Sequence, residues 1–218
     1  MRPHPSTLTF DQLAQACQLG RVQDLSRPAA TPTGIQALDS VLPFGGWPLG
    51  AVTEIMPSTE GIGELHVLMP ALSALMHAER YVAFVEPPYT PYAPALVQQG
   101  IRLDRLVLVH KQTLALSLWA TEQMLRCPAF GAVLVWPSAI GDKELRRLQL
   151  AAEAGGNLAI VYRPASAALT SSPAALRLCL RIAEQALRIE IKKCRGGYAG
   201  KVVECLFDTF TNTTAPAA

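Results

Sequence analysis

The apolar and polar positions along the middle of the chain alternate between two patterns. Some runs are short and almost continuously apolar, as expected of strands buried on both faces of a sheet. Longer segments between them carry apolar residues at helical spacing. This alternation predicts a parallel sheet with right-handed crossovers. The predicted strands are residues 51–56, 81–86, 103–109, 132–136 and 158–162, and the predicted helices are 65–76, 93–99, 112–126 and 142–154.

Apolar spacing also predicts which helical residues face the core. Pro70 falls inside the helix predicted at 65–76 and is expected to kink it, because proline removes a backbone donor. Asp142 is expected to cap the last of these helices, and Gly155 and Gly156 are expected to end it. The predicted core-facing residues are Leu114, Leu118, Leu125, Leu145, Leu148 and Ala152.

The pattern changes after residue 162. Residues 176–182, 186–193 and 201–207 alternate apolar and polar positions, which predicts antiparallel strands with one exposed face. At the start of the chain, residues 8–25 are compatible with a short amphipathic helix, followed by a proline-containing linker. We therefore divide the chain into an N-terminal helical arm and linker (1–32), a core domain (33–207) and a loose C-terminal tail (208–218). Docking of the arm onto a neighbour and folding back onto its own domain both remain open.

Composition restricts the classes of protein that the chain can belong to. Its 218 residues are 50% hydrophobic and 17% charged, with a net charge of +2. One α/β domain fits this length, and bulk charge predicts no nucleic-acid partner. The five cysteines are dispersed and form no C-x-x-C pair, which favours reduced thiols in the cytoplasm and no metal site. The longest apolar run, 65–76, is shorter than the about 20 residues that cross a bilayer, so no membrane partner is expected.

The segment 54–64 lies between the first predicted strand and the first long helix, where a nucleotide-binding fold carries its phosphate-binding loop. That loop needs G-x-x-x-x-G-K-[S/T], with a lysine for the phosphates and a hydroxyl for Mg²⁺. Met56 replaces the first glycine and Pro57 follows it; Gly61 keeps the second. The lysine and hydroxyl positions are Ile62 and Gly63, which can make neither contact.

The charged residues near this loop also argue against the binding of a nucleotide. Carboxylates at Glu54, Glu60 and Glu64 would repel a triphosphate, although the N-terminus of the following helix would still attract an anion weakly. Trp136 stands where such folds place a metal-binding aspartate, and tryptophan cannot coordinate a cation. These replacements predict a protein that binds no cofactor and hydrolyses no nucleotide.

Three further features are candidates for function. Glu86 ends its strand and is the one carboxylate placed to activate a water, although a structural role fits it better. Tyr89 and Tyr92, in a proline-rich loop, fit either base stacking or a small packed cluster. The basic residues around the final turn fit either an exposed, charge-solubilised turn or a contact with DNA phosphates or an acidic partner. These basic residues are Lys192, Lys193, Arg195 and Lys201.

Several runs resemble known sequences. Residues 33–39, 45–55, 82–86 and 131–136 resemble, in order, the RecA recombinase core. Within that superfamily, the runs 61–64, 88–96, 145–156 and 163–166 are similar to the ImuA family of translesion-synthesis accessory proteins. The resemblance covers about residues 30–207, and the shorter cell-division inhibitors of the SulA type also fit residues 61–166.

The resemblance implies a RecA-like three-layer core and a role in binding partners. ImuA-like proteins act with an ImuB-like, polymerase-related protein and a DnaE2-type polymerase in damage-induced mutagenesis, and they are also linked to RecA. The short connections 137–143 and 163–173 argue against RecA-style DNA binding. The resemblance therefore implies a non-catalytic, cytoplasmic adaptor of error-prone synthesis. Its alternatives are a SulA-like inhibitor of a tubulin-like division protein and a RecA-like ATPase.

Overall fold

The computed structural model describes residues 29–110 and 112–206. The N-terminal helix expected at 8–25 and the tail expected from 208 lie outside the described residues. The domain division of the chain therefore stays a prediction.

A mainly parallel eight-stranded sheet forms the centre of the fold, in the order β10-β9-β8-β3-β7-β6-β4-β5. All pairings among β3 to β8 are parallel, whereas β9 pairs antiparallel with both of its neighbours, β8 and β10. This arrangement confirms the predicted α/β class with C-terminal antiparallel strands, and it is compatible with a RecA-like core. The strands are β3 (Ala51–Pro57), β4 (Tyr81–Val85), β5 (Leu106–Val109), β6 (Phe130–Val135), β7 (Leu158–Tyr162), β8 (Leu176–Ala183), β9 (Ala186–Cys194) and β10 (Val202–Leu206).

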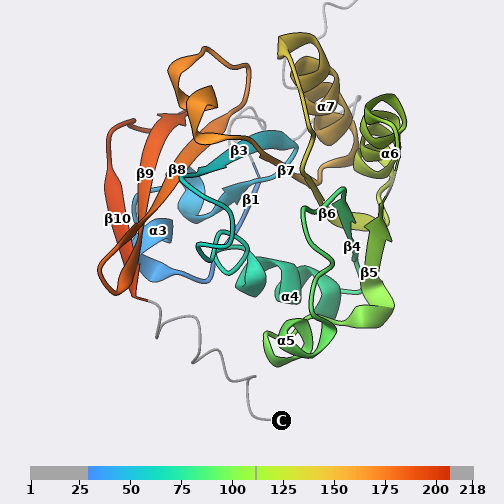
Figure 1. The fold of residues 1–218 in the computed structure, drawn as a ribbon, viewed down its shortest axis with the longest axis horizontal. Coiled ribbons are helices and arrows are strands. Elements are labelled where there is room, and N and C mark those ends of the chain that lie inside the picture. Colours follow the sequence, from blue (N-terminus) through green and yellow to red (C-terminus); the bar gives the residue numbers. More distant parts are fainter. Residues whose placement is uncertain (1–28, 111, 207–218) are drawn as a thin grey trace, which may run out of the picture.

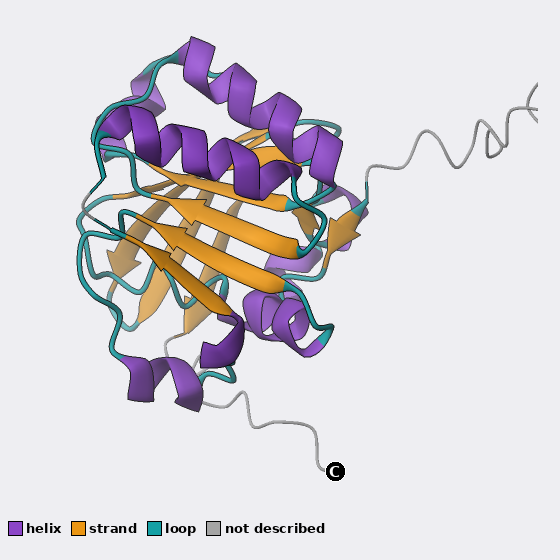
Figure 2. Ribbon diagram, turned by 90° about the vertical axis from the view of Figure 1, so that its right-hand side faces the viewer, coloured by secondary structure: helices purple, strands orange, loops and turns teal. Residues whose placement is uncertain are grey.

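Helices cover both faces of the sheet and make three layers (Figures 1 and 2). The two long helices α6 (Leu114–Arg126) and α7 (Asp142–Gly155) lie side by side on one face. Helices α4 (Met69–His77) and α3 (Gln36–Asp39) cover the other face, with α5 (Ala93–Gln98) below α4 in Figure 1. The smaller elements are the paired strands β1 (Ala30–Thr31) and β2 (Trp47–Pro48) and the 3₁₀ turns η1 (Pro43–Gly45), η2 (Leu103–Arg105) and η3 (Ala165–Leu169).

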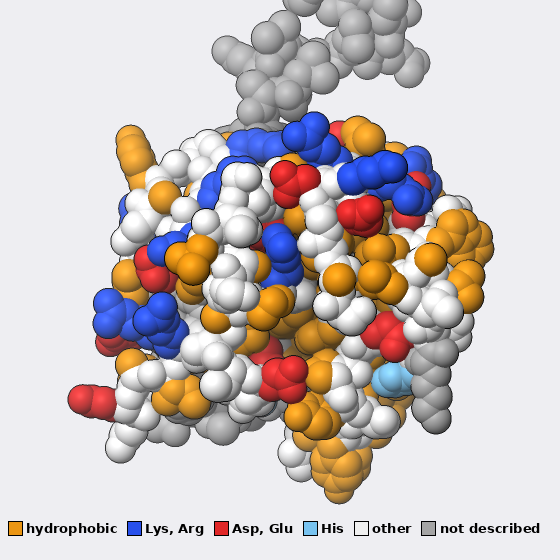
Figure 3. Space-filling view, turned by 45° about the horizontal axis from the view of Figure 1, so that its top comes forward, with side chains coloured by type: hydrophobic (Ala, Val, Ile, Leu, Met, Phe, Trp, Pro, Cys, Tyr) orange, Lys and Arg blue, Asp and Glu red, His pale blue; other side chains and the backbone are white. Residues whose placement is uncertain are grey.

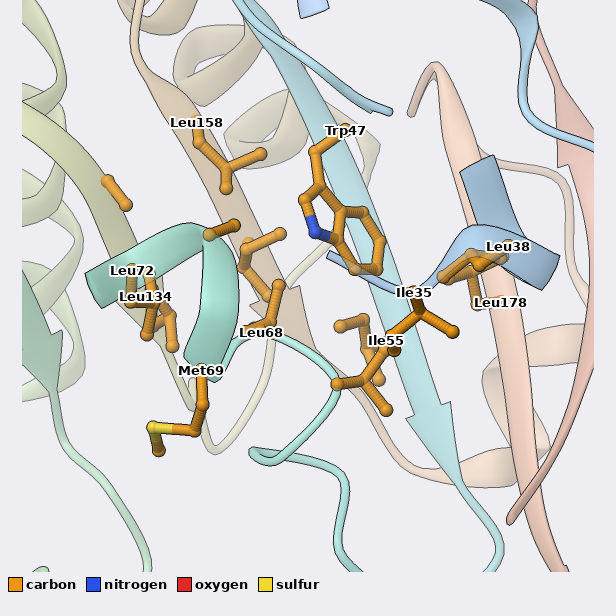
Figure 4. Packing of buried hydrophobic residues seen from close by; sticks show 14 of the residues in the cluster. Ile35, Leu38, Trp47, Ile55, Leu68, Met69, Leu72, Leu134, Leu158 and Leu178 are labelled. Carbon is orange, nitrogen blue, oxygen red and sulfur yellow. The ribbon is translucent and has the colours of Figure 1, made fainter. Parts of the chain in front are cut away.

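Strand alternation separates the core into two apolar layers. On the α3/α4 side, the fully buried Trp47 lies among side chains of α3, β3 and β7, as Figure 4 shows. On the α6/α7 side, alanine and valine side chains of the central strands meet Leu145 and Leu148. Leu125 and Ala152 are buried there as well, which confirms the inward positions predicted for α7 and the C-terminal half of α6.

One ion-pair cluster joins the two long helices. Glu122 of α6 accepts hydrogen bonds from Arg126 on the same helix (3.1 Å) and from Arg147 on α7 (2.5 Å). Burial acts to raise the pKa of Glu122, but these two guanidinium groups outweigh it and leave the pKa below its usual value. The carboxylate is therefore held in its charged form.

Several local predictions are wrong. The helix predicted at 65–76 begins at Met69, so Pro70 lies in its first turn, where proline is well tolerated, and causes no kink. Leu114 is exposed, because it lies at the very start of α6. Asp142 is the first helical residue and Gly141 is the N-cap, whose N–H donates to the carboxylate of Glu144.

The first half of β8 is buried on both faces, because η3 covers the face that was expected to be exposed. The strand expected to begin at residue 103 begins at Leu106, after the 3₁₀ turn η2. Within the described part of the chain, no helix combines the length and apolar character needed to cross a membrane.

Candidate functional site

A cleft of about 740 Å³ opens at the carboxyl edge of the parallel strands. Ligands of open α/β sheets bind at this edge, between the loops that follow the strands. The space-filling view in Figure 3 looks onto a hollowed face bordered by apolar, acidic and basic side chains. The lining comes from the loops after β3, β4, β6 and β7 and from the loop after β5 with the start of α6, and includes Pro57, Glu60, Glu86, Gln112, Leu114, Ser117, Trp136, Tyr162 and Arg163.

The loop after β3 is closed on itself. Ile62, at the position of the phosphate-binding lysine, is 5% exposed and packs into the core. Gly61 and Gly63 both adopt positive φ (75° and 91°), as a tight turn requires. The Gly61 N–H donates to Glu64 Oε1 at 3.2 Å, so this backbone N–H is already hydrogen-bonded to a carboxylate of the same loop.

The N-terminus of α4 lies away from this cleft. The helix begins at Met69, and a connection of eleven residues (58–68) separates it from the end of β3 at Pro57. Leu68 and Met69 are buried, and no residue from 61 to 70 lines the cleft. The expected weak attraction of an anion by this helix end is therefore wrong: the helix starts too late in the chain to point its amides at a ligand in the cleft.

Aromatic side chains form one wall of the cleft. Trp136, directly after β6, stacks on Tyr162 at the end of β7 with ring centroids 4.4 Å apart and planes within 4°. The Tyr162 hydroxyl donates to the backbone oxygen of Glu64 at 3.3 Å. Burial, followed by the nearby Glu64 carboxylate, raises the pKa of Tyr162 well above its usual value. The sequence places Trp136 here but gives no sign of its partner Tyr162.

Glu86 holds the opposite side of the cleft together. Its backbone is left-handed (φ 52°), and its carboxylate accepts hydrogen bonds from the Gln112 N–H (2.8 Å) and from Ser117 Oγ (3.1 Å). The carboxylate therefore ties the end of β4 to the start of α6. This geometry agrees with the structural role expected for Glu86.

The two tyrosines of the proline-rich loop do not form a packed cluster. Tyr89 is 70% and Tyr92 73% exposed. The Tyr89 hydroxyl donates to Glu60 Oε2 at 3.2 Å, at the mouth of the cleft. The packed alternative is therefore wrong, and base stacking stays a prediction.

Glu54 is not one of the carboxylates that face the loop. It is fully buried, and its carboxylate accepts hydrogen bonds from Arg163 (2.8 Å), from Ser172 Oγ (2.9 Å) and from Arg177. Two guanidinium groups thus offset its charge. The only sequence sign of this cluster is a glutamate within an apolar strand, which we interpreted as repulsion of a phosphate.

Arg177 also anchors the connection between β7 and β8. Its guanidinium donates to the carbonyl oxygens of Thr170 (2.8 Å) and Ala167 (2.7 Å). Since Arg177 reaches Glu54 as well, it fastens η3 to the centre of the sheet. Ala165, the first residue of η3, lines the cleft, so this anchoring also holds part of its wall.

The basic residues of the last turn have separate partners. Lys192 pairs with Glu190 (3.0 Å), whereas Lys193 donates to the backbone oxygen of Ser172 (2.7 Å). Lys192 is the extra residue of a bulge in β9, because Arg177 pairs with Lys193 but Leu178 pairs with Ile191. Burial, then Arg195 and Arg177, lowers the pKa of Lys193.

The other two basic residues lie beyond the end of β9. Arg195 lines a small apolar groove beside Phe44, and Lys201 lies 5.7 Å above the ring of Tyr198. The four basic residues therefore do not form one continuous basic surface. A DNA contact by the exposed members stays a prediction.

Comparisons with known proteins give two groups of relatives. No protein-family profile matches the chain. The cell division inhibitor SulA of Pectobacterium atrosepticum is 30% identical over 119 residues, which cover 54% of this chain and 71% of that protein. SulA of Photorhabdus laumondii is 26% identical over 111 residues, or 51% of this chain and 63% of that protein. Protein RecA of Bacillus pumilus is 28% identical over 119 residues, which cover 54% of this chain but only 34% of RecA.

Proposed function

The chain belongs to the family that holds the SulA cell division inhibitors and, more distantly, RecA, and from this premise we propose that it is a non-catalytic adaptor of SOS-induced translesion DNA synthesis. It acts by binding partner proteins and not by turning over a nucleotide. The partners we propose are an ImuB-like, polymerase-related protein, a DnaE2-type polymerase and RecA, all in the cytoplasm. Direct DNA binding, if it contributes, is weak.

One observation carries this proposal: among the described residues, the cleft at the nucleotide position of a RecA-like fold offers no unpaired cation for phosphates. Among the described residues that line it, Arg163 is the one positively charged side chain, and it is bound to the buried Glu54. Ile62 is in the core, and Trp136, at the position where we expected a metal-binding aspartate, stacks on Tyr162. A triphosphate placed here would face Glu60 and Glu86, and none of the described lining residues offers it a charge-assisted hydrogen bond from an unpaired cation.

A thermal-shift measurement with ATP and Mg²⁺ tests the nucleotide part. A ligand at about 100 times its Kd adds roughly 2.7 kcal/mol to the free energy of unfolding, which is readily visible. We expect no shift at millimolar ATP and no ATPase activity above a blank, with and without single-stranded DNA. A clear shift, together with turnover that is lost on Glu86→Gln, would establish the RecA-like ATPase instead.

Co-purification tests the partner part. The tagged chain is mixed with the purified ImuB-like protein, the DnaE2-type polymerase or RecA, and with the tubulin-like division protein as the competing candidate. We expect capture of the polymerase-related protein in preference to the division protein. Capture of the division protein alone would contradict the translesion role.

The second candidate function is SulA-like inhibition of cell division, and the observation that favours it is the similarity to SulA over most of SulA's length. Overproduction in a bacterial host separates the two candidates. A SulA-like inhibitor makes undivided filaments, whereas an adaptor of translesion synthesis changes the frequency of damage-induced mutation without filamentation.

A further inference from the structure

The apolar groove beside Phe44 lies at the opposite edge of the sheet from the cleft. Its volume is about 100 Å³, more than a single buried water needs. Its walls are the turn around η1, the first residues of β3 and β8, and the end of β9. Since β3 and β8 are parallel, their first residues lie at the amino edge, whereas the cleft is at the carboxyl edge. The apolar lining includes Leu42, Pro43, Pro48, Leu49, Leu176 and Cys194.

Phe44 lines this groove in an unfavourable backbone conformation. Its φ is 69°, in the left-handed region that bulky residues avoid, and the residue is 44% exposed. Its ring lies over the turn after β9, because a Cβ on Gly196 would be 3.7 Å from the ring carbons. Residues held in such conformations cluster at binding sites. The fold therefore accepts strain to keep a large apolar side chain at the surface beside the groove.

The charge at the rim of the groove is positive. Among the described residues that line it, Arg195 is the one charged side chain. Burial raises the pKa of the Cys194 thiol and the charge of Lys201 acts against this rise, so Lys201 lies close to the groove wall. Within the described part of the chain, neither Arg195 nor Lys201 forms an ion pair with a carboxylate. The rim therefore favours an occupant with negative charge.

The lining favours a protein segment over a nucleic acid. An apolar side chain enters an apolar groove without losing hydrogen bonds, whereas the edges of a nucleobase would leave donors and acceptors unpaired there. A carboxylate beside that side chain suits Arg195, because a guanidinium binds a carboxylate through two parallel hydrogen bonds. Apolar walls with a few placed polar groups are the usual composition of a binding site.

We propose that this groove is the docking site for a short acidic segment of a partner protein. A leucine or phenylalanine of that segment enters the groove beside Phe44, a neighbouring aspartate or glutamate binds Arg195, and Lys201 supplies a second positive charge. This inference rests on the adaptor role proposed above, because it names the surface through which the chain meets a partner.

Protection of Cys194 from iodoacetamide in the full chain, followed by mass spectrometry, tests the site. The probe is a peptide with one leucine–phenylalanine pair flanked by glutamates. At ten times its Kd it should slow alkylation of Cys194 roughly tenfold, because about one site in ten stays free. Cys127 is the internal control, since it is half-buried like Cys194 but does not line the groove. Peptides with lysines for the glutamates or alanines for the apolar pair, and a single-stranded oligothymidylate, should give no protection.

Fluorescence anisotropy with the same peptide, labelled, tests the charge at the rim. We expect an affinity that falls as salt is raised. Arg195→Gln should weaken binding by roughly tenfold, because it removes a charge-assisted pair. Arg181→Gln removes another exposed arginine near the opposite end of β8 from the groove, and it should leave binding unchanged. Both arginines are exposed, so neither change threatens the fold.

Three results would overturn the proposal: no protection of Cys194, protection by the lysine peptide or the oligothymidylate, or equal loss of binding in the two arginine variants. The adaptor role is judged separately by repeating the co-purification with Arg195→Gln. Capture of the partner that is equal for the original chain and this variant contradicts the docking site but leaves the adaptor role standing. Peptide binding without capture of any proposed partner supports the site and contradicts the adaptor role.

The same experiment separates a partner from the chain's own N-terminal segment. The Leu49 N–H donates to the carbonyl oxygen of Ala29, so residues 1–28 join the fold beside the groove. Were they its occupant, Cys194 would react as slowly as the buried Cys205 with or without the peptide. That result would overturn docking of a partner here.

Discussion

Replacing Arg177 by methionine is the most informative test of how the fold holds the cleft in shape. The Arg177 side chain is 6% exposed and the Glu54 side chain is not exposed at all, so solvent screens their interaction very little. The substitution keeps much of the side chain's apolar volume but leaves Glu54 with only Arg163 and Ser172 as donors. Breaking a buried pair by removing one partner costs roughly 3–5 kcal/mol.

The two carbonyls that lose the guanidinium raise the cost further. A hydrogen bond from a charged donor contributes about 1.5–3 kcal/mol, and the oxygens of Ala167 and Thr170 both lose the guanidinium. Glu54 keeps Arg163 and Ser172, so its own loss is smaller than that of a charge left with no partner, and we take about 3–5 kcal/mol for the total. For a domain of this size, that loss lowers Tm by roughly 6–20 °C.

The assay is urea unfolding of Arg177→Met beside Arg181→Met. Arg181 is exposed on the same face of β8, so its replacement is expected to change stability by less than about 0.5 kcal/mol. Hydrogen exchange supplies a local readout, since loss of Arg177 should speed exchange of the amides at 165–172 more than those of β4 or β6. Equal stabilities for the two methionine variants, or unchanged exchange in η3, would show that the buried cluster does not fasten this loop.

Three further outcomes follow from the contacts described. Glu122→Gln should lower the free energy of unfolding by about 1 kcal/mol at pH 7. Since the pKa of Glu122 in the folded chain lies below its ordinary value of 4.5, the contribution of its charge is complete above that pH and is lost on further acidification. The urea midpoints of the two chains should therefore converge in acid, and a constant gap between them would refute this. Burial raises the pKa of Cys205 to about 11 from 9.0. Alkylation of Cys205 by iodoacetamide at pH 8 should therefore be roughly 100-fold slower in the folded chain than in urea. Mass spectrometry measures this rate, and comparable rates in the two conditions would disprove the burial of Cys205. Gly155→Ala should destabilise the folded chain by more than about 2 kcal/mol, because a Cβ there would lie 1.9 Å from the Leu125 backbone oxygen. Gly156→Asn should cost under about 1 kcal/mol, because Gly156 has open space around it and a left-handed φ of 65°. Thermal melts compare the two variants, and similar losses of stability would contradict this geometry.

The sequence alone determined the architecture, because each central strand and its crossover helix is a local pattern. Apolar runs at 81–86, 132–136 and 158–162 could only be strands covered on both faces, and the alternation after residue 176 could only be an antiparallel edge. Ile62, Gly63 and Trp136 likewise predicted the loss of the phosphate and metal contacts, since those positions are fixed relative to the strands.

The tertiary structure alone decided what replaced those contacts. Glu54, Arg163 and Arg177 meet across more than a hundred residues of chain, and no local pattern encodes a charge cluster of that kind. The outward position of Trp119 depends on how α6 settles on the sheet, and the late start of α4 depends on burial of Ile62 and the residues after it. Hydrophobic periodicity specifies which segments become strands and helices, but only packing brings distant charges together and determines which surface stays open.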